Sequence, residues 1–303
     1  MGGGIWHEYY QNFSYFSDEK VREGCEPRVY LHEGDVQKAI VLVHGLSDSP
    51  HFMRALAEHF HENLGYNVYL PLLHCHGLKE PSGMEEVELS EWKNNVSWSI
   101  EKAEEHVQTI SIGGLSTGGV LSYAAAVSHP AINGGLYLFS AALDLFGGKI
   151  GLMGELFERL LLLPWIETLN DSSAPLVVPE KLYCYDRVDI DGAKELARLI
   201  SETDSISRSY GLERKFPKPI FAAHSECDET ADIEGILSLQ EKCRPEKFTF
   251  FRISESEEVP HPSVVLKEAI FDATNSDRVL NKANSQFGAM LDAIDEFEQR
   301  HFG

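Results

Sequence analysis

The fold class follows most directly from seven residues, Gly113-Gly114-Leu115-Ser116-Thr117-Gly118-Gly119. An apolar run, 109–115, leads into Ser116, and the small residues of 119–128 follow it. A serine with glycine two residues to either side is typical of a sharp turn from a buried strand into a helix, where a Cβ would clash. Such a turn exposes the serine as a nucleophile. The plainer interpretation is a glycine-rich turn that only packs a helix on a sheet.

Outward from this turn, short apolar runs alternate with helical patterns. The runs are 39–43, 66–73, 109–115, 135–140, 219–223 and 247–253. The helical patterns are 52–64, 90–107, 119–128, 231–242 and 283–300, with Ser90 expected as an N-cap. Strands that alternate with helices are typical of βαβ units. The sequence therefore predicts an α/β protein with a doubly wound, mostly parallel sheet.

The alternation breaks at residues 144–212, which are helical and loop-like with no clear strand. We predict an α/β core at 1–143 and 213–303, with a helical cap, or lid, inserted at 144–212. The insertion opens with a strongly apolar stretch, 152–166. This stretch suits a helix that packs on the core, and it equally suits the underside of a lid that holds acyl chains.

Charge and composition limit the classes of ligand. The 303 residues include 26 Lys and Arg and 48 Asp and Glu, a formal net charge of −22. A surface this negative repels phosphate backbones and anionic lipids, so we expect neither nucleic-acid binding nor stable membrane anchoring. No apolar stretch approaches the roughly 20 residues of a bilayer span. We expect a soluble cytoplasmic protein that acts on a small molecule as a monomer or homodimer.

The five cysteines and scattered histidines show no metal pattern. An odd set of cysteines without a CxxC pair indicates free thiols in a reducing compartment. His74-Cys75-His76 has no further ligand close in sequence, so a metal site there is disfavoured. The sequence therefore predicts neither a metal nor a cofactor.

A nucleophilic serine needs a general base, and the base needs an orienting acid. Three histidines after Ser116 have a suitable setting: His129, His224 and His261. His129 stands at a helix end, and His224 ends a predicted strand and could line the site. His261 lies in a loop after the last strand and before the closing helix, where this chain order places the base. We therefore predict His261 as the base, although a loop histidine between two prolines could also be structural.

Asp228 is the predicted acid, because it follows the strand 219–223 by a short loop and can reach an imidazole from there. Glu226 in the same loop and Asp144 after the preceding strand are the alternatives. A further alternative is the acidic cluster, which more often forms a solvated face: Glu255, Glu257 and Glu258.

An acyl-transfer site also needs N–H donors for the oxyanion of the tetrahedral intermediate. The residue after the nucleophile, Thr117, supplies one. The loop after the first predicted strand, His44-Gly45-Leu46, supplies the other, and we expect it from Leu46. Gly45 lets the backbone approach the substrate, and His44 is expected to brace the loop by hydrogen bonds.

These motifs together resemble the α/β-hydrolase superfamily, in particular carboxylesterases and monoacylglycerol-lipase-like members. The Gly-His-Gly turn of those families has a similar counterpart in Cys75-His76-Gly77. Two differences from the family pattern are expected to change the shape of the pocket without removing a catalytic atom. Thr117 replaces the Met or Gln often found after the serine, and proline flanks His261 on both sides.

The resemblance and the residues predict a serine carboxylic-ester hydrolase with Ser116, His261 and Asp228 as its catalytic triad. We expect it to cleave short- to medium-chain esters or monoacylglycerols through an acyl-enzyme. Gly45, Phe146 and Met153 are the expected substrate-binding residues. The same triad would also serve a thioesterase, a peptidase or a C–C bond hydrolase. From a different class, a non-catalytic binding protein of this fold would keep the pocket alone.

Overall fold

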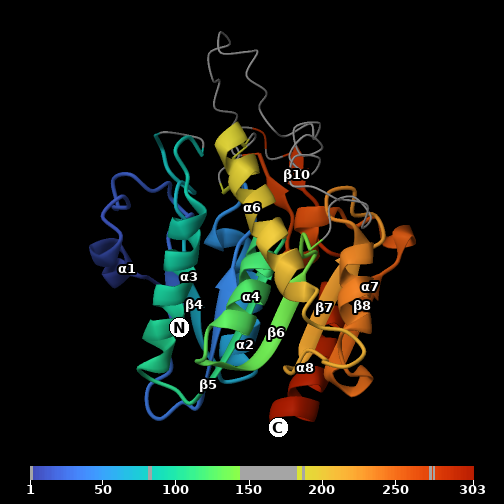
Figure 1. The fold of residues 1–303 in the computed structure, drawn as a ribbon. Helices are drawn as coiled ribbons and strands as arrows, with labels where there is room; N and C mark the ends of the chain where they lie inside the picture. The colour runs from blue at the N-terminus through green and yellow to red at the C-terminus, as the bar shows by residue number, and fades with distance from the viewer. Residues whose placement is uncertain (1–2, 81–83, 144–182, 186–187, 273–274, 276) are drawn as a thin grey trace.

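The computed structural model describes residues 3–80, 84–143, 183–185, 188–272, 275 and 277–303. The described residues form an eight-stranded sheet with the strand order β1-β2-β4-β3-β5-β6-β7-β8 (Figure 1). From β4 to β8 every neighbouring pair is parallel, whereas β1, β2 and β4 pair antiparallel at one edge. A separate hairpin, β9 with β10, stands outside this sheet.

The elements have the following bounds in chain order. The strands are β1 (Gly4–Ile5), β2 (Arg28–Tyr30), β3 (Lys38–Val43), β4 (Asn67–Leu70), β5 (Thr109–Leu115), β6 (Ile132–Phe139), β7 (Ile220–Ser225), β8 (Phe248–Ile253), β9 (Ile270–Phe271) and β10 (Val279–Asn281). The helices are α1 (His7–Asn12), α2 (Arg54–Glu62), α3 (Leu89–Glu104), α4 (Thr117–Ser128), α6 (Ile190–Ser207), α7 (Ile233–Glu241) and α8 (Phe287–Phe302). Short 3₁₀ turns are η1 (Pro50–Met53), η2 (Pro245–Lys247), η3 (Glu255–Glu257) and η4 (His261–Val265).

The sheet separates two hydrophobic cores, and β3 shows why its sequence is a continuous apolar run. Ala39, Val41 and Val43 face one core, and Ile40 and Leu42 face the other, all of them buried. A strand covered by helices on both sides needs apolar side chains at every position, because neither face meets water. Figure 1 shows α3, α4 and α6 in front of the sheet and α2 and α8 behind it.

The predicted α/β class and the mostly parallel sheet are confirmed. Each run and helical pattern named from the sequence corresponds to an observed element, with ends that differ by a few residues. The short antiparallel strands β1 and β2 were not foreseen, because a strand of two or three residues leaves no periodicity to detect.

The prediction that Ser90 caps a helix is wrong. Helix α3 begins at Leu89, and the residue before it, Glu88, makes no side-chain cap. The first turn is instead held from another helix, because the Leu89 N–H donates to Glu195 Oε2 of α6 at 3.1 Å. A tertiary contact therefore satisfies a helix terminus that a local residue was expected to satisfy.

The C-terminal part of the predicted insertion belongs to the helical layer of the core. Helix α6 packs against α3 and α4, and its apolar face is buried with theirs. It lies on the same side of the sheet as these two helices (Figure 1). The helical cap predicted at 144–212 stays a prediction, because residues 144–182 lie outside the described part of the chain.

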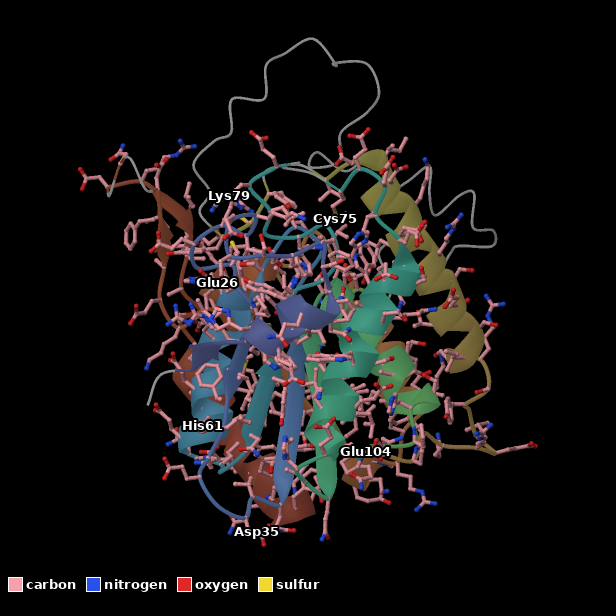
Figure 2. All side chains as sticks on the ribbon, turned by 90° about the vertical axis from the view of Figure 1, so that its left-hand side faces the viewer. Glu26, Asp35, His61, Cys75, Lys79 and Glu104 are labelled. Atoms are coloured by element: carbon pink, nitrogen blue, oxygen red, sulfur yellow. The ribbon has the colours of Figure 1, made fainter. Side chains whose placement is uncertain are left out.

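Two ends of the molecule can be told apart by residues that flank the strands. Figure 2 shows Cys75, which follows β4, at the upper end and Asp35, which precedes β3, at the lower end. The carboxyl ends of the parallel strands therefore lie at the upper end, where open α/β sheets bind ligands. Among the described helices, none is both long enough and apolar enough to cross a bilayer.

Candidate active site

Ser116 occupies the strained turn between β5 and α4. Its backbone has φ 52° and ψ −118°, a conformation that a residue with a Cβ rarely adopts. The Ser116 N–H donates to the Phe139 carbonyl of β6 at 3.0 Å, which holds the turn against the neighbouring strand. The serine is 8% exposed and stands at the N-terminus of a 12-residue helix. The expected strand–turn–helix is present, and it places the serine at the carboxyl end of β5.

The two glycines of the motif are required by close backbone approach. A Cβ on Gly114 would lie 2.4 Å from the carbonyl carbon of Gly118. A Cβ on Gly118 would lie 2.2 Å from the Val43 carbonyl oxygen and 2.4 Å from that of His44. Contacts this short never occur between real atoms, so only glycine lets the helix start this close to β3 and β5.

The loop after β3 lies directly against the serine. A Cβ built on Gly45 would be 3.4 Å from Ser116 Cβ. His44 braces this loop from within, because its Nδ1 donates to the Gly45 carbonyl at 2.9 Å and its Nε2 accepts from Leu73 N–H at 3.1 Å. A trans peptide points its C=O and N–H in opposite directions, so holding Gly45 O also sets the direction of Leu46 N–H.

His44 is buried and neutral. Burial, reinforced by the neighbouring His76 ring, holds the pKa of His44 well below its ordinary value. A second buried histidine, His76, contacts two carbonyl oxygens. Its Nε2 contacts the Leu46 carbonyl oxygen, and its Nδ1 lies 2.9 Å from the His74 carbonyl oxygen. Burial lowers the pKa of His76 to about 4. The Cys75-His76-Gly77 turn thus supports the loop that carries Leu46.

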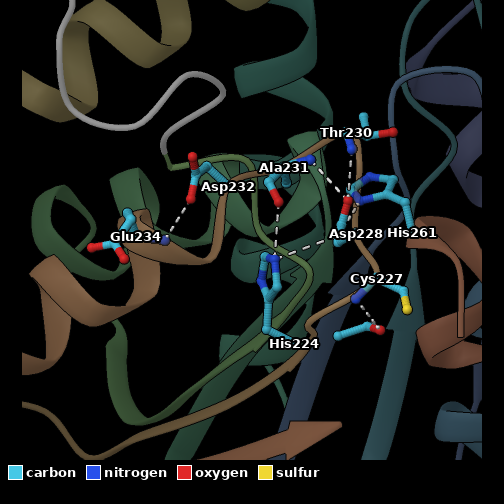
Figure 3. Close-up of polar contacts among 9 residues, drawn as sticks. His224, Cys227, Asp228, Thr230, Ala231, Asp232, Glu234 and His261 are labelled. Atoms are coloured by element: carbon cyan, nitrogen blue, oxygen red, sulfur yellow. Dashed lines mark hydrogen bonds and ion pairs between the residues drawn. The ribbon is translucent and has the colours of Figure 1, made fainter. Parts of the chain in front are cut away.

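Asp228 and His261 form a short, buried polar pair at this edge of the sheet (Figure 3). His261 Nδ1 lies 2.6 Å from Asp228 Oδ2, and the other carboxylate oxygen accepts the N–H groups of Thr230 and Ala231 at 2.9 Å each. The aspartate side chain is 1% exposed and the histidine 12%. Burial opposes ionisation, but His261 and these hydrogen bonds outweigh it, so the pKa of Asp228 lies below its ordinary value.

Local sequence explains the position of His261. Pro260 precedes it with φ −73°, and Pro262 follows it within the 3₁₀ turn η4. The Ser263 N–H donates to the Pro260 carbonyl at 2.9 Å and closes the turn. Proline on both sides restricts the backbone, which therefore holds the imidazole against Asp228.

Two other candidates for the acid are engaged with other partners. Glu226 pairs with Arg252 at 2.5 Å and accepts the Glu255 N–H. Glu257 accepts the Ser285 hydroxyl at 2.7 Å. Asp144 lies outside the described residues, as do the expected pocket residues Phe146 and Met153.

The structure brings the expected residues together in two groups. Gly45 packs on Ser116, and Asp228 bonds His261, both at the carboxyl edge of the sheet. Thr117 is buried at the first position of α4, and Leu46 is 5% exposed. Among the described residues no hydrogen bond joins the Ser116 hydroxyl to the His261 ring. Such bonds are commonly long in a free enzyme and shorten when substrate binds.

Asp48 is a residue that sequence reasoning missed. A Cβ on Gly45 would lie 2.3 Å from Asp48 Oδ2, so this carboxylate rests on the loop beside Ser116. It is 7% exposed. The sequence does show an acidic residue three positions after Gly45. It does not show that the chain folds back so that this carboxylate contacts the Gly45 backbone.

A cavity of about 330 Å³ opens beside His261. Two glutamates in its wall, Glu229 and Glu258, give it negative charge. Its lining residues are Cys227, Glu229, Thr230, Glu258, Pro260, His261 and Pro262. A cavity with these walls favours a neutral or cationic group next to the imidazole and disfavours an anion.

Comparison with known proteins places the chain in a family. The model of the hydrolase family described as serine aminopeptidase, S33, matches residues 34–255. This range includes the loop after β3, Asp228 and the sharp turn at Ser116 between β5 and α4, which we call the elbow. The chain belongs to this family of α/β hydrolases. The matched region ends just before His261, so the assignment of His261 as the base rests on chain order and on the geometry.

A curated relative is the thermostable monoacylglycerol lipase of Bacillus sp. (strain H-257). It is 33% identical over 186 residues, 60% of this chain and 68% of that protein. Among solved structures, the lipolytic enzymes LipS and LipT of metagenomic origin give a TM-score of 0.64 at 19% identity, covering 93% of this chain and all of that one. The monoacylglycerol lipase of Paleococcus ferrophilus gives 0.59 at 16% identity, covering 91% and 99%. At these identities the structural matches establish the fold.

Proposed function

We propose that this α/β hydrolase is a serine ester hydrolase that cleaves short- to medium-chain acyl esters or monoacylglycerols. The observation that carries the proposal is the buried Asp228–His261 pair, 2.6 Å apart, at the same sheet edge as the strained Ser116. An acid, a base and a nucleophile in this chain order meet the needs of acyl transfer on this fold. The curated relative, named as a monoacylglycerol lipase, supports an ester substrate.

In the proposed reaction Ser116 Oγ attacks the ester carbonyl while His261 Nε2 takes the hydroxyl proton. Asp228 holds the ring by its Nδ1–H and stabilises the imidazolium that forms. His261 then protonates the leaving alcohol, and the acyl group stays on Ser116. A water molecule, deprotonated by the same histidine, hydrolyses the acyl-enzyme and restores the serine.

The oxyanion of each tetrahedral intermediate would be held by the N–H groups of Leu46 and Thr117. The Thr117 N–H belongs to the first turn of α4, where the helix dipole adds partial positive charge. The Leu46 N–H is directed by the bonds that hold Gly45 O, from His44 and from the Asp48 N–H at 3.3 Å. Donors fixed before the reaction stabilise developing charge without reorganising, which is the largest contribution in many such sites.

The substrate we propose is uncharged near the reacting carbon. Glu229 and Glu258 beside His261 and the net charge of −22 both disfavour an anionic ester. Gly45 would contact the acyl or alcohol group from the loop. A cap over the serine, with Phe146 and Met153 in contact with the acyl chain, completes the proposal.

The test is hydrolysis of p-nitrophenyl esters from two to sixteen carbons, and of monoacylglycerols, by the wild type, Ser116→Ala and Ser128→Ala. Ser128 lies at the exposed end of the same helix, so Ser128→Ala is the matched control. We expect Ser116→Ala to lose at least about a thousandfold in kcat. Ser128→Ala should keep wild-type rates. Ester turnover that survives in Ser116→Ala would refute the triad.

A peptidase is the second candidate, because the matching family is described as serine aminopeptidase. The same enzyme preparations are therefore assayed on aminoacyl p-nitroanilides. A higher kcat/KM on anilides than on any ester, abolished in Ser116→Ala, would replace the ester proposal by an aminopeptidase with the same machinery.

A further inference from the structure

His224, near the end of β7, brings a second imidazole to Asp228. Its Nε2 lies 3.5 Å from Asp228 Oδ2, the oxygen that also accepts from His261. Figure 3 shows the two rings directed at the carboxylate from different sides. The His224 side chain is fully buried, so this contact is shielded from water.

The contacts of His224 define its tautomer. Nε2 lies 3.0 Å from the Ala231 carbonyl oxygen, which can only accept, so Nε2 must carry the proton. Among the described residues Nδ1 has no hydrogen-bond partner. Burial lowers the pKa of His224, although the Asp228 carboxylate acts in the opposite direction. The ring is therefore neutral, with its single N–H donated to Ala231 O and the same ring edge 3.5 Å from Asp228 Oδ2.

The turn at residues 228–231 is held both by the Asp228 carboxylate and by His224. Thr230 and Ala231 each donate an N–H to Asp228 Oδ1 at 2.9 Å. His224 anchors this turn to β7 through the Ala231 carbonyl. One imidazole thus fixes the backbone donors of one carboxylate oxygen, and its edge lies against the other oxygen.

Each carboxylate oxygen consequently faces donors that limit its rotation. Oδ1 has two backbone N–H groups, and Oδ2 has His261 Nδ1–H and the edge of His224. The charged and titratable groups that face His224 are Asp228, His261 and, farther off, Asp232. Buried carboxylates stay ionised when donors of this kind surround them.

We propose that His224 is a positioning residue that holds the Asp228 carboxylate in the orientation that aligns His261. This rests on the proposed function, in which His261 is the base. His224 acts through Asp228 and touches no reacting atom, so its loss should lower kcat and leave KM nearly unchanged.

The experiment compares His224→Phe, which removes the donor and keeps a ring, with His224→Gln, whose amide can reach the position of Nε2. We expect His224→Phe to lower kcat by about 10- to 100-fold, because it removes the bond that holds Ala231 and the polar ring edge beside the Asp228 carboxylate. His224→Gln should recover most of this loss. His59→Phe is the matched control, because His59 is another buried histidine paired with a carboxylate, Asp295 at 2.6 Å, away from the site.

A spectroscopic measurement tests His224 without any substrate. The His261 Nδ1–H bound to Asp228 should give the most downfield proton resonance of the free protein. We expect it to broaden or shift upfield in His224→Phe and to persist in His224→Gln and His59→Phe. Wild-type kcat together with an unchanged resonance in a folded His224→Phe would overturn the proposal. An equal loss of kcat in His224→Phe and His224→Gln with the resonance intact would also overturn it, because it would indicate packing alone.

The tautomer of His224 can be measured in the wild type, so this test does not depend on whether a variant folds. Nitrogen-15 spectra of the histidine rings should show His224 protonated at Nε2 across neutral pH, and protonation at Nδ1 would contradict the proposed contact. If ester hydrolysis instead proves independent of Ser116, the proposed function fails. The resonance and the tautomer still report whether His224 positions Asp228.

Discussion

Backbone atoms crowd Gly118 so closely that its side-chain hydrogen cannot be replaced. A Cβ there would meet the Val43 carbonyl oxygen at 2.2 Å, and that oxygen belongs to the central strand β3, which cannot shift freely. We expect Gly118→Ala to destabilise the protein by about 3 kcal/mol or more, at the upper end of overpacking effects. Urea denaturation of the variant and the wild type measures the change.

Gly288 is the matched control for that substitution. It also lies in the first turn of a helix, α8, but nothing stands within 4 Å of its Cβ position. Gly288→Ala should raise the free energy of unfolding by about 0.5 kcal/mol, because alanine favours the helix and restricts the unfolded chain. If both variants unfold at the same urea concentration, steric approach at the elbow is not the reason for its glycine.

At the scale of elements, one carboxylate ties helix α8 to the sheet. Glu298 is 3% exposed and accepts the hydroxyls of Tyr66, which precedes β4, and Tyr137 in β6. Lys38, at the start of β3, lies 3.5 Å from the same carboxylate. We expect Glu298→Ala to cost about 3 kcal/mol, since it leaves two buried hydroxyls without their acceptor. Thermal and urea unfolding provide the measurement.

Glu296, exposed on the same helix, provides the comparison. Glu296→Ala should change the free energy of unfolding by less than about 0.5 kcal/mol, as surface substitutions usually do. A loss for Glu298→Ala no larger than this would mean that α8 is held by its apolar face alone.

The whole molecule should lose stability as the pH falls below neutral, because buried histidines stay neutral in the folded state. An unfolded histidine binds a proton near pH 6.5, whereas burial lowers the pKa of His76 to about 4 and that of His44 well below its ordinary value. The unfolded state therefore binds more protons between these values, and stability falls as pH decreases through this window. His76 alone should account for about 2 kcal/mol between pH 6.5 and 5.

Urea denaturation at several pH values between 7 and 5 tests this expectation. His76→Gln removes the titrating ring, so its free energy of unfolding should depend less steeply on pH, whatever its absolute value. Equal slopes for the wild type and His76→Gln would show that this ring titrates alike in both states.

Much of the architecture was predictable because it depends on short stretches of chain. The continuous apolar run 39–43 predicts a strand covered on both faces, and β3 has both faces buried. The elbow around Ser116 predicts a strand–turn–helix, and β5 and α4 meet there. Short edge strands such as β1 escaped prediction, because only pairing with β2 stabilises them.

The residues of the candidate site could also be predicted in part from the sequence. Sequence order alone nominated Ser116, Asp228 and His261, since the chain order on this fold is restricted. It favoured Asp228 and left Glu226, two residues earlier in the same loop, as an alternative. The structure pairs Glu226 with Arg252 and Asp228 with His261, which supports the acid predicted from the sequence.

The sequence by itself determined the features that arise within a few residues: the alternation of strand and helix, the glycines of the elbow and the prolines around His261. Only the tertiary structure decided the contacts between distant segments. Glu195 of α6 accepts the first N–H of α3, α6 packs on α3 and α4, and His224 brings a second imidazole to Asp228. The physical reason is the range of each interaction. Backbone conformation responds to neighbours in sequence, whereas a buried polar group finds its partner only after the segments have packed together.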